Sequence, residues 1–99
     1  MTRIDFAALN YLSKSNLFSL IPEILPGGRL RGREWVVRNP TRNDRKAGSF
    51  SVNVDSGRWG DFATGDRGGD FVSLVAYVNG ESQSDAAKRI LDRLGVSHV

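Results

Sequence analysis

Arginines and aromatic rings alternate along the middle of the chain. Between Arg29 and Arg67 there are nine basic residues, eight of them arginine, against five acidic ones. The aromatic residues among them are Trp35, Phe50, Trp59 and Phe62. A guanidinium group is a planar fork that binds phosphate and also stacks on bases. The combination is typical of proteins that bind single-stranded nucleic acid, because the backbone follows positive charge and the bases stack on rings.

Eight of these nine basic residues and one tryptophan are the predicted nucleic-acid-binding residues. They are Arg31, Arg33, Arg38, Arg42, Arg45, Lys46, Arg58, Arg67 and Trp59. Arg42, Arg45 and Lys46 stand in a polar loop, which either contacts phosphate beside a sheet or is an ordinary solvated loop. Strand alternation allows a groove walled by Arg38, Trp35, Arg58 and Trp59. The alternative is that the rings fill the core, where we expect at least one tryptophan.

The residue types that are missing exclude several kinds of chemistry. The chain has no cysteine and a single histidine, His98, next to its end. This excludes disulfides, iron–sulfur clusters and thiolate zinc sites, and it leaves no histidine for a catalytic triad. No nucleophile stands with a matching base, so we expect no enzymatic activity, no cofactor and no metal in these residues.

Two other motifs have a functional and a structural interpretation. The glycine-rich loop 65–70 opens a helix and could bring backbone N–H groups to a phosphate, but it lacks the Gly-Lys-Ser/Thr ending of a P-loop. Asp61, Asp66 and Asp70 could suggest a Mg²⁺ site. Since Asp70 suits a helix N-cap and Asp66 a turn, we favour the structural interpretation of both motifs.

The helices and strands expected from the sequence, which must position these residues, form a single α+β domain. Of the 99 residues, 39% are hydrophobic and 25% charged, with a net charge of +3, which suits one small globular unit. Residues 1–28 form an N-terminal helix over 5–21 and a turn. In this segment the polar stretch 13–16 weakens the helix and Pro22 ends it.

Residues 29–70 form the β region, and residues 71–95 the helical part. Strands are expected around Leu30, over 34–38, over 49–54 where apolar residues alternate, and over 58–62. They give a small curled antiparallel sheet of three to four strands. Helices follow over 71–78, capped by Asp70 and ended by Gly80, and from about residue 82 to Leu94.

The order of several short motifs resembles a known family. Asn39-Pro40, Ser49-Phe50, Trp59, and Gly69-Asp70 before an apolar helix succeed one another as in the N-terminal Cys-His-Cys-Cys zinc ribbon of bacterial, phage and plasmid DNA primases. The resemblance covers residues 29–95. Asn39 stands at the position of the first zinc-binding cysteine, and Asp61 and Thr64 at those of the last two.

The chain departs from this family at the residues that bind zinc. No metal-binding position holds cysteine or histidine, so the resemblance implies a degenerate ribbon without zinc. The former metal knuckle must then be held by packing of Trp59, Phe62 and Phe71 and by hydrogen bonds from Asp61 or Thr64. The catalytic Toprim core of primases is absent from these residues.

The resemblance implies an accessory, non-catalytic module that binds single-stranded DNA template in phage-type or plasmid-type replication, beside a Toprim primase or helicase domain. The alternative is a protein-interaction adaptor that has lost nucleic-acid binding and docks a replication partner. The helix around Phe6, Leu9 and Leu12, or the apolar face around Phe71, would then form the contact. No apolar run suits a membrane helix and the first residues do not resemble a signal peptide, so we expect a cytoplasmic protein with no membrane partner.

Overall fold

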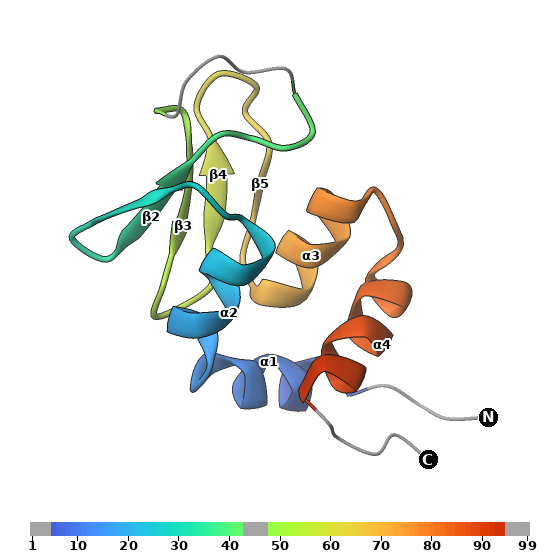
Figure 1. Ribbon diagram of the computed structural model, residues 1–99. Coiled ribbons are helices and arrows are strands. Elements are labelled where there is room, and N and C mark those ends of the chain that lie inside the picture. The colour runs from blue at the N-terminus through green and yellow to red at the C-terminus, as the bar shows by residue number, and fades with distance from the viewer. Residues whose placement is uncertain (1–4, 43–47, 95–99) are drawn as a thin grey trace.

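A computed structural model of the protein describes residues 5–42 and 48–94 (Figure 1). Helices α1 (Phe6–Lys14) and α2 (Leu17–Ile24) come first. Strands β1 (Arg29–Arg31), β2 (Glu34–Val37), β3 (Phe50–Asn53), β4 (Trp59–Asp61) and β5 (Arg67–Gly68) follow, and then helices α3 (Phe71–Asn79) and α4 (Gln83–Leu94). The strands form one antiparallel sheet in chain order. The predicted α+β class is confirmed, with five strands instead of three to four.

The N-terminal segment differs from the single predicted helix. The helix is interrupted at Ser15 and Asn16, inside the polar stretch expected to weaken it, and α2 begins at Leu17. The prediction that Pro22 ends the helix is wrong, because Pro22 lies inside α2. Leu17, Leu20 and Ile21 are buried on this helix, and their packing outweighs the roughly 3 kcal/mol that an interior proline costs.

The turns between strands explain the register of the sheet. Gly32 has φ +62°, a left-handed conformation that lets the chain reverse between β1 and β2. The Asn53 side chain accepts hydrogen bonds from the backbone N–H groups of Asp55 and Ser56, both at 2.9 Å, and so closes the β3–β4 turn. The fifth strand was missed because it is two residues long and lies within a glycine-rich loop that resembles a turn.

The last two helices agree with their predicted signals. The Asp70 carboxylate accepts the Ser73 backbone N–H at 2.8 Å, which is the N-cap expected for α3. Gly80 ends α3 in the left-handed conformation, with φ +63°. The prediction that Asp70 is the N-cap of this helix is therefore confirmed. The 65–70 loop contains β5 and this cap.

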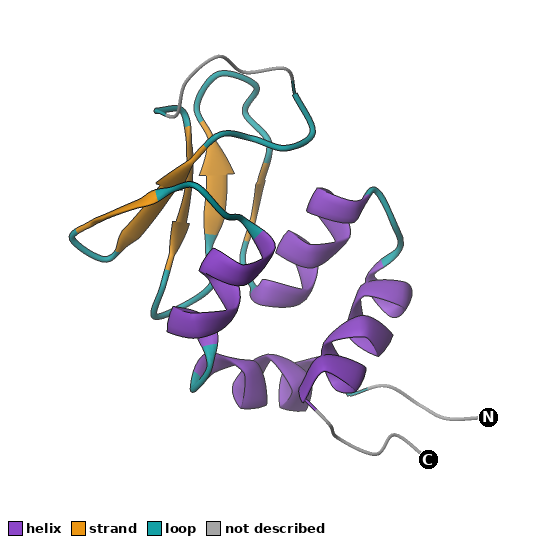
Figure 2. Ribbon diagram, viewed as in Figure 1, coloured by secondary structure: helices purple, strands orange, loops and turns teal. Residues whose placement is uncertain are grey.

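All four helices lie on one side of the sheet, as Figure 2 shows by colour. The core lies between the two layers, where Phe50, Val52 and Val72 are fully buried. The opposite side of β2–β5 is covered by no helix among the described residues, and we call it the open face. No described helix is both long and apolar enough to cross a membrane.

Candidate nucleic-acid interface

The open face of the sheet carries cations at both ends and small residues in the middle. Cross-strand pairing aligns Arg29, Val36, Ser51, Gly60 and Arg67 in one row. Alternation places these residues opposite the buried side chains of β3 and β4. The neighbouring row begins with Arg31 and ends at Arg58, which is paired with Asn53 through a backbone hydrogen bond.

A hollow of about 470 Å³ lies on the β3–β5 side of this face. Ser51, Asn53 and Gly60 are among the residues that line it, with Arg58 and Arg67 also contributing. Three carboxylates, Glu34, Asp61 and Asp66, line it as well. Glu34 accepts hydrogen bonds from Ser51 Oγ at 3.3 Å and from Asn53 Nδ2 at 2.9 Å, and Asp66 accepts the Tyr77 hydroxyl at 2.8 Å. Phosphate would therefore favour the arginine sides of the hollow over its centre.

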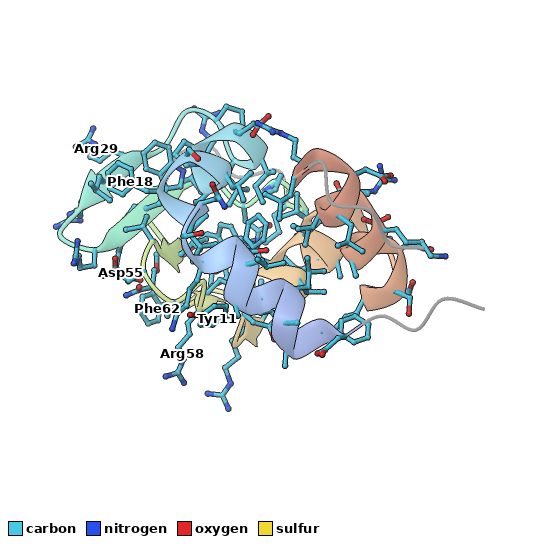
Figure 3. All side chains as sticks on the ribbon, turned by 90° about the horizontal axis from the view of Figure 1, so that it is seen from below. Tyr11, Phe18, Arg29, Asp55, Arg58 and Phe62 are labelled. Carbon is cyan, nitrogen blue, oxygen red and sulfur yellow. The ribbon has the colours of Figure 1, made fainter. Side chains whose placement is uncertain are left out.

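Phe62 is the aromatic ring that this hollow presents to solvent. It immediately follows β4, its backbone N–H donates to Ser49 O at 2.9 Å, and its side chain is 90% exposed. Figure 3 shows Phe62 and Arg58 projecting from the molecule on the side away from α4. The prediction that Phe62 packs to hold the knuckle is thus wrong. A ring this exposed, lining the same hollow as two arginines, is suited to stacking on a base.

Both tryptophans belong to the core side of the sheet. Trp59 is only 8% exposed, its indole N–H donates to Ser73 Oγ at 3.0 Å, and its ring lies 4.5 Å from that of Tyr77. Trp35 is half-buried and donates to the Leu25 carbonyl at 2.9 Å. Arg58 faces the other way, so the predicted groove of two arginines and two tryptophans does not form. The prediction that Trp59 contacts the nucleic acid is corrected, because its ring is packed in the core and is not available to stack on a base.

A close approach explains why Trp59 lies inward. Gly68 on β5 pairs with Trp59, and a Cβ at Gly68 would lie 2.4 Å from the indole nitrogen and 2.5 Å from Ser73 Oγ. Only glycine leaves room for the ring at this point. The glycine-rich segment before α3 therefore has a packing role, consistent with its structural interpretation.

The remaining predicted cations are dispersed. Arg33 pairs with Asp55 at 2.7 Å at the end of the sheet, and both side chains are more than half exposed. Arg38 is exposed but borders a separate hollow beside the turn at Pro26 and Gly27. Arg45 and Lys46 lie outside the described residues. The structure thus brings together Arg58 and Arg67 of the predicted set, with Arg31 farther along the same face.

Arg42 belongs to a polar cluster around the buried Asn39 and Asp61, which also contains Thr41 and Tyr77. Asp61 is 2% exposed, and its Oδ2 accepts hydrogen bonds from Asn39 Nδ2 at 2.7 Å and from Arg42 Nη1 at 3.1 Å. Asn39 Nδ2 also donates to the Tyr77 hydroxyl at 2.8 Å. We call these five residues the Asn39–Asp61 cluster. It joins the segment after β2 to the end of β4 and to α3.

The cluster does not fit a metal ion. Asn39 offers an uncharged amide, and the Asp61 carboxylate already accepts hydrogen bonds from Asn39, from Arg42 and from the Ala63 backbone N–H at 2.8 Å. Thr64 is exposed, and its hydroxyl accepts the Asp66 N–H at 3.1 Å. Among the residues that the structure describes, no three histidine, cysteine or carboxylate side chains gather as a metal site would require.

The stability of the protein should depend on pH through Asp61. Burial raises the pKa of this carboxyl, but hydrogen bonds from Asn39, Ala63 N–H and Ser49, and the charge of Arg42, outweigh burial and hold the pKa below its usual value. The stabilisation is complete above the unfolded pKa of about 4 and is lost as pH falls through the lower native value. Urea unfolding between about pH 7 and pH 3 should show the stability advantage over Asp61→Asn shrinking in acid. Parallel curves for the two proteins would contradict this.

The surfaces expected for a protein adaptor are internal. Leu9 is 2% exposed and Phe71 3%, because α1 and α3 pack their apolar faces on each other and on the core. Phe6 is partly buried against the same core, and only Leu12 remains substantially exposed. The apolar faces predicted to dock a partner are therefore largely occupied by this domain itself.

Comparison with protein-family models and with curated proteins found no match to this chain. The open face and the Asn39–Asp61 cluster are therefore the features that bear on function. Sequence reasoning pointed to Arg58 and Arg67, but it missed Ser51, Asn53 and Gly60. The alternating pattern of β3 was the signal for the first two, since it places them opposite the buried Phe50 and Val52.

Proposed function

We propose that this protein is a non-catalytic module that binds single-stranded DNA across the open face of its sheet. The observation that carries the proposal is the exposed Phe62 ring, which lines the same hollow as Arg58, Arg67 and the small residue Gly60. A ring accepts a stacked base, guanidinium groups accept the flanking phosphates, and the small central residues leave space for the sugar–phosphate chain.

The proposed setting is template handling in replication of the phage or plasmid type, in the cytoplasm, beside a Toprim primase or helicase domain. The resemblance to primase zinc ribbons supports this setting. So does the Asn39–Asp61 contact at 2.7 Å, because it joins two positions that both bind the metal in that family. In this chain a hydrogen-bonded cluster takes the place of the zinc cross-link.

The direct test is titration of a fluorescent single-stranded oligonucleotide at about 50 and 200 mM salt. We expect modest affinity and a logarithmic salt slope of about −0.7 for each phosphate neutralised. Replacing Arg58 and Arg67 together by alanine should make the slope shallower by about 1.4, since two phosphate contacts are lost. Arg33→Ala is the matched control, because that arginine is already paired with Asp55. Absence of binding at low salt would overturn the proposal.

The carboxylate of Glu34 should oppose DNA binding. It lines the same hollow as the two arginines, and its hydrogen bonds to Ser51 and Asn53 leave its charge in place. Glu34→Gln keeps the size of the side chain and removes the charge, so affinity at low salt should rise several-fold, by about 1 kcal/mol. The same titration measures the change, and an unaltered affinity would place the DNA away from this hollow.

The Arg42, Arg45 and Lys46 triple alanine variant addresses the polar loop. Arg42 contributes to the Asn39–Asp61 cluster, so the loss of that arginine also lowers stability and complicates the result. A double variant of Arg45 and Lys46 alone avoids this. A shallower salt slope for the double variant would add the loop to the DNA footprint, and an unchanged slope would remove it.

A further inference from the structure

Next to the hollow of the open face lies a second one, on the far side of the β3–β4 turn. It measures about 270 Å³ and lies between that turn and α1, lined by Tyr11, Lys14 and Ser56 among others. Ser56 also lines the hollow of the open face. Both hollows therefore border the β3–β4 turn, and a chain that leaves the open face past Arg58 would pass this turn to reach α1.

Tyr11 gives the second hollow the same chemistry as the first. Its side chain is 78% exposed, and Lys14 stands one helical turn further along α1, on the same side. An exposed ring and a cation that line one hollow repeat the combination of residue types found in Phe62 and Arg58. In Figure 3, which views the molecule from below, Tyr11 and Arg58 project on the same side, and Phe18 stands apart toward the β1–β2 side.

Helix α1, which carries Tyr11, is held in place by a cap, by core packing and by a hydrogen bond to α3. Asp5 caps the helix by accepting the Ala8 N–H at 3.0 Å, and Leu9 is buried in the core. Asn10 Oδ1 accepts the Val72 N–H at 3.2 Å and so ties α1 to the start of α3. Because these contacts use the inner side of α1, Tyr11 faces solvent without contributing to the core.

We infer that Tyr11 and Lys14 form a second binding site for the same DNA strand, reached around Ser56 from the open face. This inference rests on the proposed function. One base stacks on Phe62, the backbone passes Arg58 and the β3–β4 turn, and a later base stacks on Tyr11 with its phosphate at Lys14. The site extends the footprint to a helix that lies outside the part of the chain resembling primases.

Oligonucleotide length separates the two sites. A strand of about 4 nucleotides fills the open face alone, whereas one of about 12 nucleotides can occupy both sites. The longer strand should bind wild-type protein about tenfold more tightly than the shorter one, since one further stack is gained. Tyr11→Ala should abolish this gain and leave the affinity for the short strand unchanged. Lys14→Ala should make the salt slope of the long strand shallower by about 0.7.

Two control variants make the test specific. Tyr11→Phe keeps the ring and should keep the gain, whereas Phe18→Ala removes another exposed ring, 64% exposed, that lines neither hollow. The inference is overturned if the length-dependent gain survives in Tyr11→Ala, or if Phe18→Ala abolishes it equally. Failure of the short strand to bind wild-type protein would instead overturn the proposed function itself.

Discussion

Replacing Asp61 by alanine is expected to lower the free energy of unfolding by about 3 kcal/mol. The carboxylate is buried and receives hydrogen bonds from Asn39, from Arg42 and from the Ala63 backbone N–H. Its removal leaves those donors without their acceptor. Arg42 is 35% exposed and can turn toward water, so the loss should lie at the lower end for a broken buried pair. Urea unfolding, followed by the fluorescence of the two tryptophans, measures it.

Asp55→Ala is the matched control for this experiment. It breaks the exposed pair with Arg33, which should contribute less than about 1 kcal/mol. Asp61→Asn should fall between the two, because it keeps an acceptor for Ala63 but loses the charge that Arg42 faces. Equal losses for Asp61→Ala and Asp55→Ala would show that the Asn39–Asp61 cluster does not hold the segment after β2 to the end of β4. A domain of this size has about 5–15 kcal/mol of stability in total, so the expected loss is readily measured.

The elements that could be predicted are those with local signals. Asp70 caps α3 through a bond three residues along the chain, and Gly80 ends it by its own backbone conformation. The alternation from Phe50 to Val54 likewise gave the strand and its two faces. These features depend on neighbouring residues, so the sequence contains what determines them. Pro22 shows the limit, because its tolerance inside α2 depends on tertiary packing of Leu20 and Ile21.

The candidate site was only partly predictable for a related reason. Alternation shows that Trp59 and Asp61 share one face and that Gly60 and Phe62 share the other, which the structure confirms. It does not show which of the two faces the helices cover. That choice depends on long-range contacts such as Trp59 with Ser73 and Asp61 with Asn39. The sequence therefore led to the prediction that Trp59 binds DNA, although it is buried in the core. It likewise led to the prediction that Phe62 packs in the core, although it is exposed.

The sharpest probe of DNA binding is a charge placed at Gly60, in the middle of the open face. A Cβ there would lie 3.7 Å from Arg67 Cβ and 3.7 Å from Asp66 O, which is ordinary contact, so the fold should tolerate a side chain. Gly60→Glu fills the hollow and places a carboxylate beside the phosphates. We expect affinity for single-stranded DNA at low salt to fall about a hundredfold, since like charges in contact cost several kcal/mol.

Gly60→Gln and Gly60→Lys separate the contribution of charge from that of volume. All three side chains occupy the hollow, so the steric effect is comparable, but the expected order of affinity is lysine, then glutamine, then glutamate. Glutamine and glutamate should differ by about tenfold at low salt and converge as salt screens the added charge. Thermal unfolding of each variant checks that the sheet is intact. Equal affinities for the three folded variants would show that the DNA does not cross Gly60, because a charge within the footprint cannot be without effect on a polyanion.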